Sequence, residues 1–435
     1  MNRLALFFAF ALAAFLLFSC SESKENDGDN TGKDKDAAEE DGGEETPKDD
    51  DDADRGDEEK DGGEKEPPKE CVAAGPNCAP DPSKAGPYPV GVKTITITYN
   101  FREGSKEMER ALKTEIWYPT TEEAAASLPL DAYNLRDDMP ERILPEFEGM
   151  EINPITQQAY RDAPLRAEDA PYPLLLFSHG NGGIRYQSTF FCAHIASHGY
   201  VVVSPDHVGD TMFDFVASDK KDIEHVLSSV PERPADMNAV QKEFFRMNED
   251  SSDFFFGSID EGRVGISGHS FGGHTTVVVG GRNPYITAAA PMAAPAASYK
   301  LEGYLQKPFP VPILMHGATR DDSVTYDQQE YAWKNMLGEK AAFATLIDGG
   351  HFSYTDICRM DIEAVAKAAK LNVNYILRDG CGEDNIPYEI AHDYINTVTT
   401  AFFNYHLRKS KESAAYFAPE YYSESEAMTV ERRGY

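Results

Sequence analysis

The chain has 435 residues, which is enough for one large domain or two ordinary ones. Its formal net charge is −33, and so acidic a protein is not expected to bind the phosphate backbone of a nucleic acid. The six cysteines have neither Cys-x-x-Cys spacing nor the Cys/His spacing of zinc sites, so we expect no metal site.

The first 20 residues have the pattern of a secretory signal. Arg3 gives a basic start, and the apolar run at 4–18 is too short for a comfortable membrane span. Its end, Leu17-Phe18-Ser19-Cys20, resembles the lipobox of bacterial lipoproteins, which implies that Cys20 is the lipidated first residue of the mature protein. The same resemblance, with Ser21 after the cysteine, implies the outer membrane. We therefore expect an exported protein that touches the membrane only through a lipid at Cys20; a plain signal peptide with an incidental cysteine is the alternative.

Residues 21–85 are predicted to form an acidic tether. Between Ser21 and Glu70 there are 23 Asp and Glu against 8 Lys and Arg, a net charge of −15, and there is no aromatic residue, Val, Ile or Leu. A segment of this composition cannot bury a core, so we expect a disordered spacer that holds the following domain away from a membrane surface.

From residue 86 onward, short apolar strands alternate with helical segments. Polar and apolar residues alternate at 93–99, as in a strand with one solvent-exposed face, whereas 174–177 is wholly apolar, as in a buried parallel strand. The alternation predicts a single α/β domain over residues 86–409, with a mainly parallel eight-stranded sheet and helices on both faces. The strands are expected at 93–99, 113–118, 174–177, 200–203, 264–266, 286–290, 311–316 and 342–347, and the main helices at 187–198, 234–247, 275–281, 327–337 and 389–407.

Two long connections interrupt this pattern, at 120–171 and 207–262. We interpret them as insertions that shape a lid or an acyl pocket, with Phe213, Phe215 and the phenylalanines at 254–256 as apolar lining or as buried packing. Residues 410–435 form a charged and aromatic C-terminal tail, and the sequence leaves open whether this tail packs against the domain.

The segment Gly268-His269-Ser270-Phe271-Gly272 fits the Gly-x-Ser-x-Gly nucleophile elbow. It follows an apolar strand and precedes a helical segment, which is the context that exposes a serine hydroxyl on a sharp turn above the sheet. The flanking glycines allow a strained backbone and a close approach of helix to strand. We therefore predict that Ser270 is a nucleophile.

A glycine-rich turn, Ser178-His179-Gly180-Asn181-Gly182-Gly183, follows the strand at 174–177. An elbow enzyme takes one oxyanion donor from the amide after its nucleophile and the second from a loop at this place. This predicts the N–H groups of Phe271 and Asn181 as oxyanion donors. A tight turn that merely requires glycine is the alternative interpretation.

The remaining members of a triad are sought after the later strands, because ligands bind beyond the carboxyl ends of parallel strands. Asp321 follows the strand at 311–316 and is preferred to its neighbour Asp322, although the two are not separated decisively. His351 lies in a glycine-rich loop after the strand at 342–347, whereas His392 and His406 fall on the closing helix. The sequence thus predicts a Ser270–His351–Asp321 triad that needs neither a cofactor nor a metal.

Four of the remaining cysteines are predicted to form disulfides, since an exported protein meets an oxidising environment. Cys71 and Cys78 bracket a turn, Cys358 and Cys381 flank a helical segment, and Cys192 is left as a buried free thiol.

Taken together, these motifs resemble the α/β-hydrolases of the dienelactone-hydrolase-like and platelet-activating-factor-acetylhydrolase-like group. The matching stretches are Gly86-Pro87-Tyr88-Pro89-Val90-Gly91, Glu115-Ile116-Trp117-Tyr118-Pro119, Phe177-Ser178-His179-Gly180, Pro205-Asp206-His207, Arg233-Pro234-Ala235-Asp236, Gly268-His269-Ser270-Phe271-Gly272-Gly273 and Gly350-His351-Phe352. The resemblance implies the α/β-hydrolase fold and a serine hydrolase.

The sequence departs from this group at two places. Ser270 stands where dienelactone hydrolase itself has cysteine, and no acid follows the strand after the elbow, where animal acetylhydrolases carry theirs. An acid one strand later is the arrangement of bacterial polyester hydrolases and lipases. We therefore expect an esterase acting on a small or short-acyl carboxylic ester, with an amidase or peptidase using the same triad, or a non-catalytic surface lipoprotein, as alternatives.

Overall fold

The computed structural model describes residues 79–103, 105–217, 223–360 and 374–435. The predicted signal, Cys20, nearly all of the acidic tether and the Cys71–Cys78 pair lie outside these residues. Within the described ranges, no helix combines the length and the hydropathy that a membrane crossing requires.

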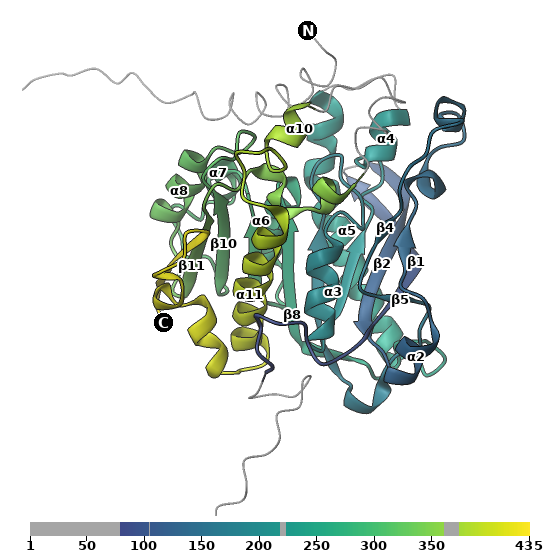
Figure 1. Ribbon diagram of the computed structural model, residues 1–435, viewed down its shortest axis with the longest axis horizontal. Coiled ribbons are helices and arrows are strands. Elements are labelled where there is room, and N and C mark those ends of the chain that lie inside the picture. Colours follow the sequence, from purple (N-terminus) through teal and green to yellow (C-terminus); the bar gives the residue numbers. More distant parts are fainter. Residues whose placement is uncertain (1–78, 104, 218–222, 361–373) are drawn as a thin grey trace, which may run out of the picture. The chain divides into compact units, whose positions relative to one another are not determined.

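A twisted sheet runs through the domain (Figure 1) in the order β12-β11-β10-β9-β8-β6-β7-β2-β1-β5. The six strands from β7 to β11 are parallel, while β1, β2 and β12 add antiparallel pairs at the two sides. The strands are β1 (Val90–Glu103), β2 (Lys106–Pro119), β5 (Tyr160–Arg161), β6 (Tyr172–Ser178), β7 (Val201–Pro205), β8 (Ile259–His269), β9 (Ile286–Met292), β10 (Ile313–Ala318), β11 (Ala341–Leu346) and β12 (Met428–Arg433).

The expected mainly parallel sheet is confirmed, but the expected number of eight strands is wrong, because the sheet gains one strand at each edge. β5 is only two residues long and pairs with Gly91 and Val92, so it is too short to produce a pattern in the sequence. β12 pairs antiparallel with β11 and comes from the segment that we expected to be a C-terminal tail. The tail is therefore part of the domain.

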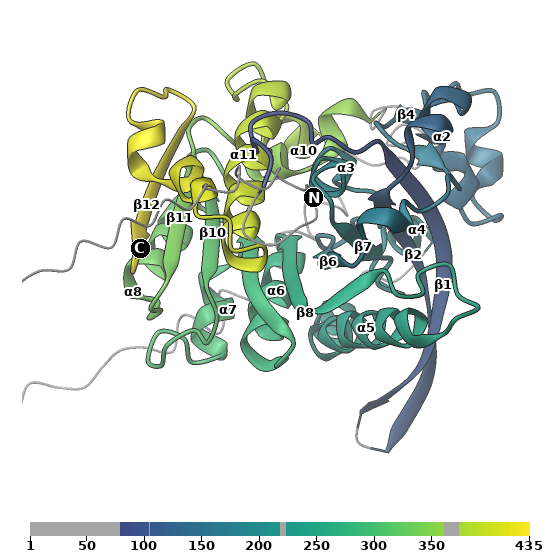
Figure 2. The same ribbon diagram turned by 90° about the horizontal axis from the view of Figure 1, so that it is seen from below.

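Helices cover both faces of the sheet, as Figure 2 shows: α5, α6 and α7 lie on one face, and α3 and α11 lie on the other. The predicted helix at 234–247 lies within the longer α5, which also takes in Pro231. The α-helices are α2 (Glu122–Ser127), α3 (Thr189–Ser197), α4 (Met212–Ala217), α5 (Ile223–Glu249), α6 (Phe271–Arg282), α7 (Ala296–Leu301), α8 (Tyr326–Asn335), α10 (Asn374–Arg378) and α11 (Tyr388–Leu407), and the 3-10 helices are η1 (Leu135–Asp138), η2 (Leu144–Phe147), η3 (Ala167–Asp169), η4 (His351–Tyr354), η5 (Asp356–Arg359), η6 (Glu412–Phe417) and η7 (Pro419–Tyr422).

The core consists of two apolar layers, one on each face of the sheet. Successive side chains of a strand point to opposite faces, so Leu175 and Phe177 join the layer under α3 and α11, while Leu174 and Leu176 join the layer under α5 and α6. Because both faces are covered, the central strands are apolar at nearly every position.

The two insertions take different parts in the fold. The segment 120–171 forms α2, the 3-10 turns η1 to η3, the edge strand β5 and a separate two-stranded ribbon of β3 (Ala132–Tyr133) and β4 (Ile155–Thr156). The prediction that residues 254–256 line an acyl pocket is wrong, because they precede β8 and so lie at the end of that strand opposite to Ser270. Phe254 and Phe255 instead pack against the ring of Tyr118.

The predicted cysteine pair Cys358–Cys381 is confirmed as a disulfide, and Cys192 is a buried free cysteine.

Candidate functional site

Ser270 occupies the turn between β8 and α6, as an elbow requires. Its backbone has φ 58° and ψ −115°, a conformation that non-glycine residues rarely adopt and that costs about 1–3 kcal/mol. Hydrogen bonds from Ser270 N to Met292 O (2.8 Å) and from His274 N to Ser270 O (3.0 Å) hold the turn in place. The hydroxyl consequently stands at the carboxyl edge of the sheet, at the start of α6.

The two glycines of the elbow are required by close backbone contacts. A Cβ atom on Gly268 would lie 2.5 Å from Gly272 O, and one on Gly272 would lie 1.9 Å from Ser178 O. Neither position has room for a side chain, because the atoms in the way belong to the backbone. These contacts bring the start of α6 against the end of β6, where the glycine-rich loop begins.

The three residues of the predicted triad form one hydrogen-bonded chain. Ser270 Oγ lies 2.8 Å from His351 Nε2, and His351 Nδ1 lies 2.9 Å from Asp321 Oδ2. His351 and Asp321 are buried, whereas Ser270 is partly exposed. In this arrangement the imidazole can accept the serine proton at Nε2 while its Nδ1–H donates to the carboxylate.

Geometry separates Asp321 from its neighbour. The side chain of Asp321 accepts hydrogen bonds from Ser323 N and Val324 N at Oδ1, and from Gln329 Nε2 at Oδ2 in addition to His351. The Asp322 side chain is exposed. Of the later histidines, His392 bonds Thr355 O and His406 bonds the Tyr435 hydroxyl, so neither reaches the elbow.

The electrostatic surroundings of His351 favour its charged form. Burial lowers the pKa of the imidazole, but the carboxylates of Asp321 and, to a smaller extent, Asp379 outweigh burial, so the pKa of His351 lies above its ordinary value. His269, whose ring centroid is 4.6 Å from that of His351, donates from Nε2 to His351 O at 2.8 Å. Burial holds the pKa of His269 well below its usual range, so His269 stays neutral beside the site.

The predicted oxyanion loop lies directly beside the elbow. Gly180 N donates to Gln187 Oε1 (3.0 Å), and Gly183 N donates to Gly180 O (3.0 Å), so these two amides are engaged within the protein. A Cβ on Gly180 would approach His269 Nδ1 to 3.2 Å, which shows how near the loop is to the elbow. The N–H groups of Asn181 and Phe271 stay the predicted oxyanion donors.

A buried ion pair that we did not predict holds this loop. Arg233 of α5 donates to His179 O (2.5 Å) and Gly180 O (2.9 Å), and its guanidinium carbon lies 4.8 Å from the centre of the Phe271 ring. Its Nε pairs with Asp210 Oδ2 (2.6 Å), and Asp210 Oδ1 accepts from Asn181 Nδ2 (2.6 Å). The segment Arg233-Pro234-Ala235-Asp236 is prominent in the sequence, but nothing in the pattern indicates which backbone it contacts.

A second Ser–His–Asp chain lies beneath the loop. Ser178 Oγ is 2.8 Å from His207 Nε2, and His207 Nδ1 is 2.8 Å from Asp236 Oδ2, but all three residues are fully buried. Burial and Arg233 lower the pKa of His207 to about 4, and Arg110 forms a 2.7 Å ion pair with Asp236. A substrate cannot reach Ser178, so we interpret this chain as support for the loop above it.

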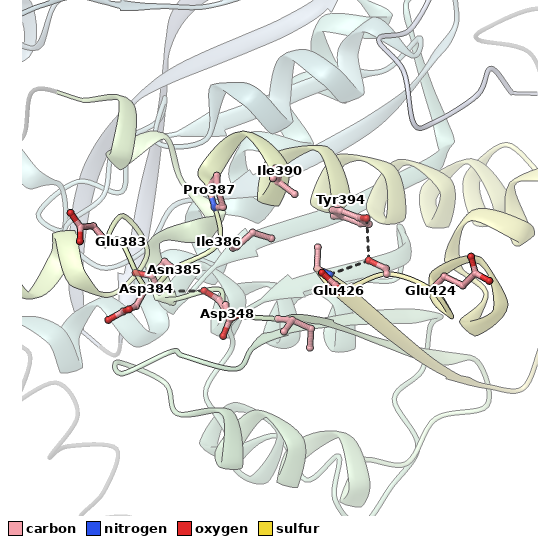
Figure 3. Close-up of a pocket in the computed structure, with 13 residues that line it drawn as sticks. Asp348, Glu383, Asp384, Asn385, Ile386, Pro387, Ile390, Tyr394, Glu424 and Glu426 are labelled. Carbon is pink, nitrogen blue, oxygen red and sulfur yellow. Dashed lines mark hydrogen bonds between the residues drawn. The ribbon is translucent and has the colours of Figure 1, made fainter.

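A pocket of about 640 Å³ is lined in part by Ile347 and Asp348, at the start of the loop that leads to His351 (Figure 3). It is bounded by the end of β11, the start of α11 and the turn before β12, and the triad residues do not line it. The carboxylates in its lining are those of Asp348, Glu383, Asp384, Glu424 and Glu426. Its wall at 383–387 is fixed to the His351 loop, since Ile386 N donates to Asp348 O at 2.9 Å.

Two family models and a solved structure resemble the chain. The model for platelet-activating factor acetylhydrolase, isoform II, matches residues 79–226, and the model for the dienelactone hydrolase family matches residues 160–372. The solved structure is a ferulic acid esterase from Streptomyces cinnamoneus, with 22% sequence identity and a TM-score of 0.52 over 74% of this chain and 91% of that chain.

Proposed function

Because the chain is a carboxylesterase-type hydrolase with the α/β-hydrolase fold, we propose that it cleaves its ester through an acyl-enzyme on Ser270. In this proposal His351 acts as general base and acid, and Asp321 orients it. The observation that carries the proposal is the hydrogen-bonded chain from Ser270 Oγ through His351 to Asp321 Oδ2. It belongs to a strained elbow whose serine is accessible, whereas the second Ser–His–Asp chain is fully buried.

The proposed reaction has two halves. In the first, His351 Nε2 takes the proton of Ser270 as Oγ attacks the ester carbonyl, and the developing oxyanion accepts hydrogen bonds from the amides of Phe271 and Asn181. His351 then gives its proton to the departing alcohol. In the second half, His351 deprotonates a water molecule that attacks the acyl-enzyme, and the carboxylic acid leaves as Ser270 regains its proton.

The proposed substrates are small or short-acyl carboxylic esters. The ring of Phe215 in α4 lies against Gly182, where it would be 2.5 Å from an added Cβ, so the oxyanion loop has an apolar neighbour that suits a short acyl or alcohol group. An amidase would use the same triad, and the assay below separates the two activities.

A fluorophosphonate probe tests the nucleophile directly. We expect the wild type to be labelled and Ser270→Ala to be unlabelled and inactive. Ser252→Ala serves as a matched control, because Ser252 is exposed in the turn before β8, at the opposite end of the strand that carries the elbow. A wild type that resists labelling, or a Ser270→Ala variant that keeps its esterase activity, contradicts the proposal.

The bond that is cleaved is tested with paired substrates. We expect hydrolysis of p-nitrophenyl esters, falling as the acyl chain lengthens, and little hydrolysis of the corresponding anilides. Anilide hydrolysis at a comparable kcat/KM would identify an amidase, and a preference for long acyl chains would overturn the proposed substrate class.

We also propose that the protein is anchored to the cell envelope through a lipid on Cys20. Support comes from the basic and apolar start of the chain and from its lipobox-like end at Cys20. Incorporation of a radiolabelled fatty acid into the wild type but not into Cys20→Ala is the expected result, with loss of the variant from the membrane fraction. A wild type without label contradicts the proposal.

A further inference from the structure

Asp379 lies outside the predicted triad but is bonded to both loops that carry it. Its Oδ1 accepts hydrogen bonds from His351 N (2.7 Å) and Asp322 N (3.1 Å), and its Oδ2 accepts from the hydroxyl of Ser323 (2.7 Å). Its carbonyl oxygen accepts from Phe352 N (2.8 Å). One buried residue therefore joins the loop after β10, which holds Asp321, to the loop after β11, which holds His351.

Asp379 is itself held firmly from both sides. Its amide donates to Tyr375 O in α10 (3.0 Å), and two residues later Cys381 forms a disulfide with Cys358, which belongs to η5 after the His351 turn. The backbones of Gly350 and Asp379 are also in close contact, because a Cβ on Gly350 would lie 2.4 Å from the carbonyl carbon of Asp379. The Asp379 carboxylate therefore has little freedom to move relative to His351.

We propose that Asp379 is a positioning residue of the hydrolase site, which holds the His351 imidazole in line between Asp321 and Ser270 by fastening the two loops together. The inference rests on the proposed triad. Correct placement matters because a displacement of about 1 Å at a reacting group can cost roughly 100-fold in rate.

The charge of Asp379 has a second consequence. The titratable groups that face His351 are Asp321, Asp379 and His269, and burial keeps His269 neutral. Asp379 is one of the two carboxylates that raise the pKa of His351. Its removal makes the imidazolium less favourable, so the free base persists to lower pH. Activity that requires the free base then extends further into the acid range.

Two substitutions separate the geometric effect from the charge effect. Asp379→Asn keeps an oxygen for the amides of His351 and Asp322 but removes the charge, so we expect kcat on the alkaline plateau within about threefold of wild type and an acidic limb displaced to lower pH. Asp379→Ala removes the bonds as well, and we expect kcat to fall by about 100-fold with KM changed by less than about threefold.

The measurements are kcat and KM for a p-nitrophenyl ester between pH 5 and 9, together with the rate of fluorophosphonate labelling over the same range. Asp348→Asn is the matched control, because Asp348 lies three residues before His351 in the same loop but is exposed and pairs with Arg320. We expect its pH profile to coincide with that of the wild type.

The proposal is overturned if the Asp379→Asn profile coincides with that of the wild type while Asp379→Ala keeps its kcat. It is also overturned if both variants change only the melting temperature. Where Asp379→Ala does not fold, Asp379→Asn alone decides, and a pH profile that coincides with that of the wild type then overturns the proposal. Failure of the triad itself is distinguishable, because Ser270→Ala would then retain activity whatever the Asp379 variants do.

Discussion

Replacing Asp321 by asparagine turns one hydrogen-bond acceptor at His351 into a donor. Asp321 Oδ1 accepts from the backbone amides of Ser323 and Val324, so the amide oxygen of the asparagine stays on that side. The new NH₂ group then occupies the place of Oδ2, where it faces two donors, His351 Nδ1–H and Gln329 Nε2. Gln329 is fixed in turn, because its Oε1 accepts from Ala318 N at 2.9 Å.

The NH₂ group of the new asparagine and the Nδ1–H of His351 cannot bond to each other, and this conflict between two donors is relieved most easily if His351 changes its tautomer. Its proton then moves to Nε2, the atom 2.8 Å from Ser270 Oγ, and that nitrogen can no longer accept the serine proton. A wrong tautomer of this kind lowers kcat by about 10⁴-fold in a serine protease, which corresponds to roughly 5 kcal/mol of transition-state stabilisation. We expect a loss of the same order for Asp321→Asn. Asp322→Asn alters an exposed side chain and should stay within about twofold of wild type.

Both variants are assayed with the same p-nitrophenyl ester, and their melting temperatures are compared with that of the wild type. A folded Asp321→Asn that retains more than a few per cent of kcat would show that its contact with His351 does not set the tautomer. A larger loss of kcat in Asp322→Asn than in Asp321→Asn would show that Asp322, and not Asp321, is the acid of the triad.

Three further predictions concern the surroundings of the site. Arg233→Met releases the carbonyl groups of His179 and Gly180 and should lower kcat at least about tenfold with KM nearly unchanged. Arg233→Lys should recover part of the loss. Equal kcat in the wild type and both variants contradicts a role of Arg233 in holding the predicted oxyanion loop. Gly272→Ala places a methyl group against Ser178 O and should destabilise the protein by about 3 kcal/mol or more in urea unfolding. Gly262→Ala is the control: Gly262 is an exposed position of β8, where an added Cβ would meet only the Asp260 side chain at 3.3 Å, so its midpoint should be unchanged. Burial lowers the pKa of His207 to about 4, so between about pH 6.5 and 4 this histidine binds a proton only when the protein unfolds. The free energy of unfolding should therefore fall as the pH drops through that window, by up to about 1.4 kcal/mol per pH unit for each buried histidine of this kind. Urea midpoints at pH 7 and 5 in high salt, which screens the acidic net charge, check this, and a midpoint that does not fall contradicts it.

Local patterns in the sequence were sufficient for the central strands and for the candidate nucleophile. Strands buried on both faces must be apolar throughout, so the runs at 174–177 and 200–203 are recognisable without any partner. The Gly-x-Ser-x-Gly segment is equally local, since backbone contacts at Gly268 and Gly272 exclude any larger residue. His351 could be chosen because chain order and strand ends leave few candidates.

Edges and long-range contacts were not predictable in this way. The edge strand β12 exists only because β11 offers it a partner, and the placement of Phe254 depends on the direction in which β8 runs. The choice between Asp321 and Asp322 depends on which of the two side chains points inward after β10. Two adjacent aspartates have the same composition, so the sequence does not show which of them faces His351.

The sequence by itself determined the fold class, the elbow with Ser270 and the glycine-rich loop with Asn181, because each depends on neighbouring residues. The pairing of Cys358 with Cys381, predicted from the helical segment between them, was settled by the structure. Only the tertiary structure decided that Arg233 holds the carbonyl groups of the predicted oxyanion loop and that Asp379 joins the loops of Asp321 and His351. Both side chains act on backbone groups far away in the chain. A backbone carbonyl or amide is the same in every residue, so the sequence carries no mark of the partner it will meet.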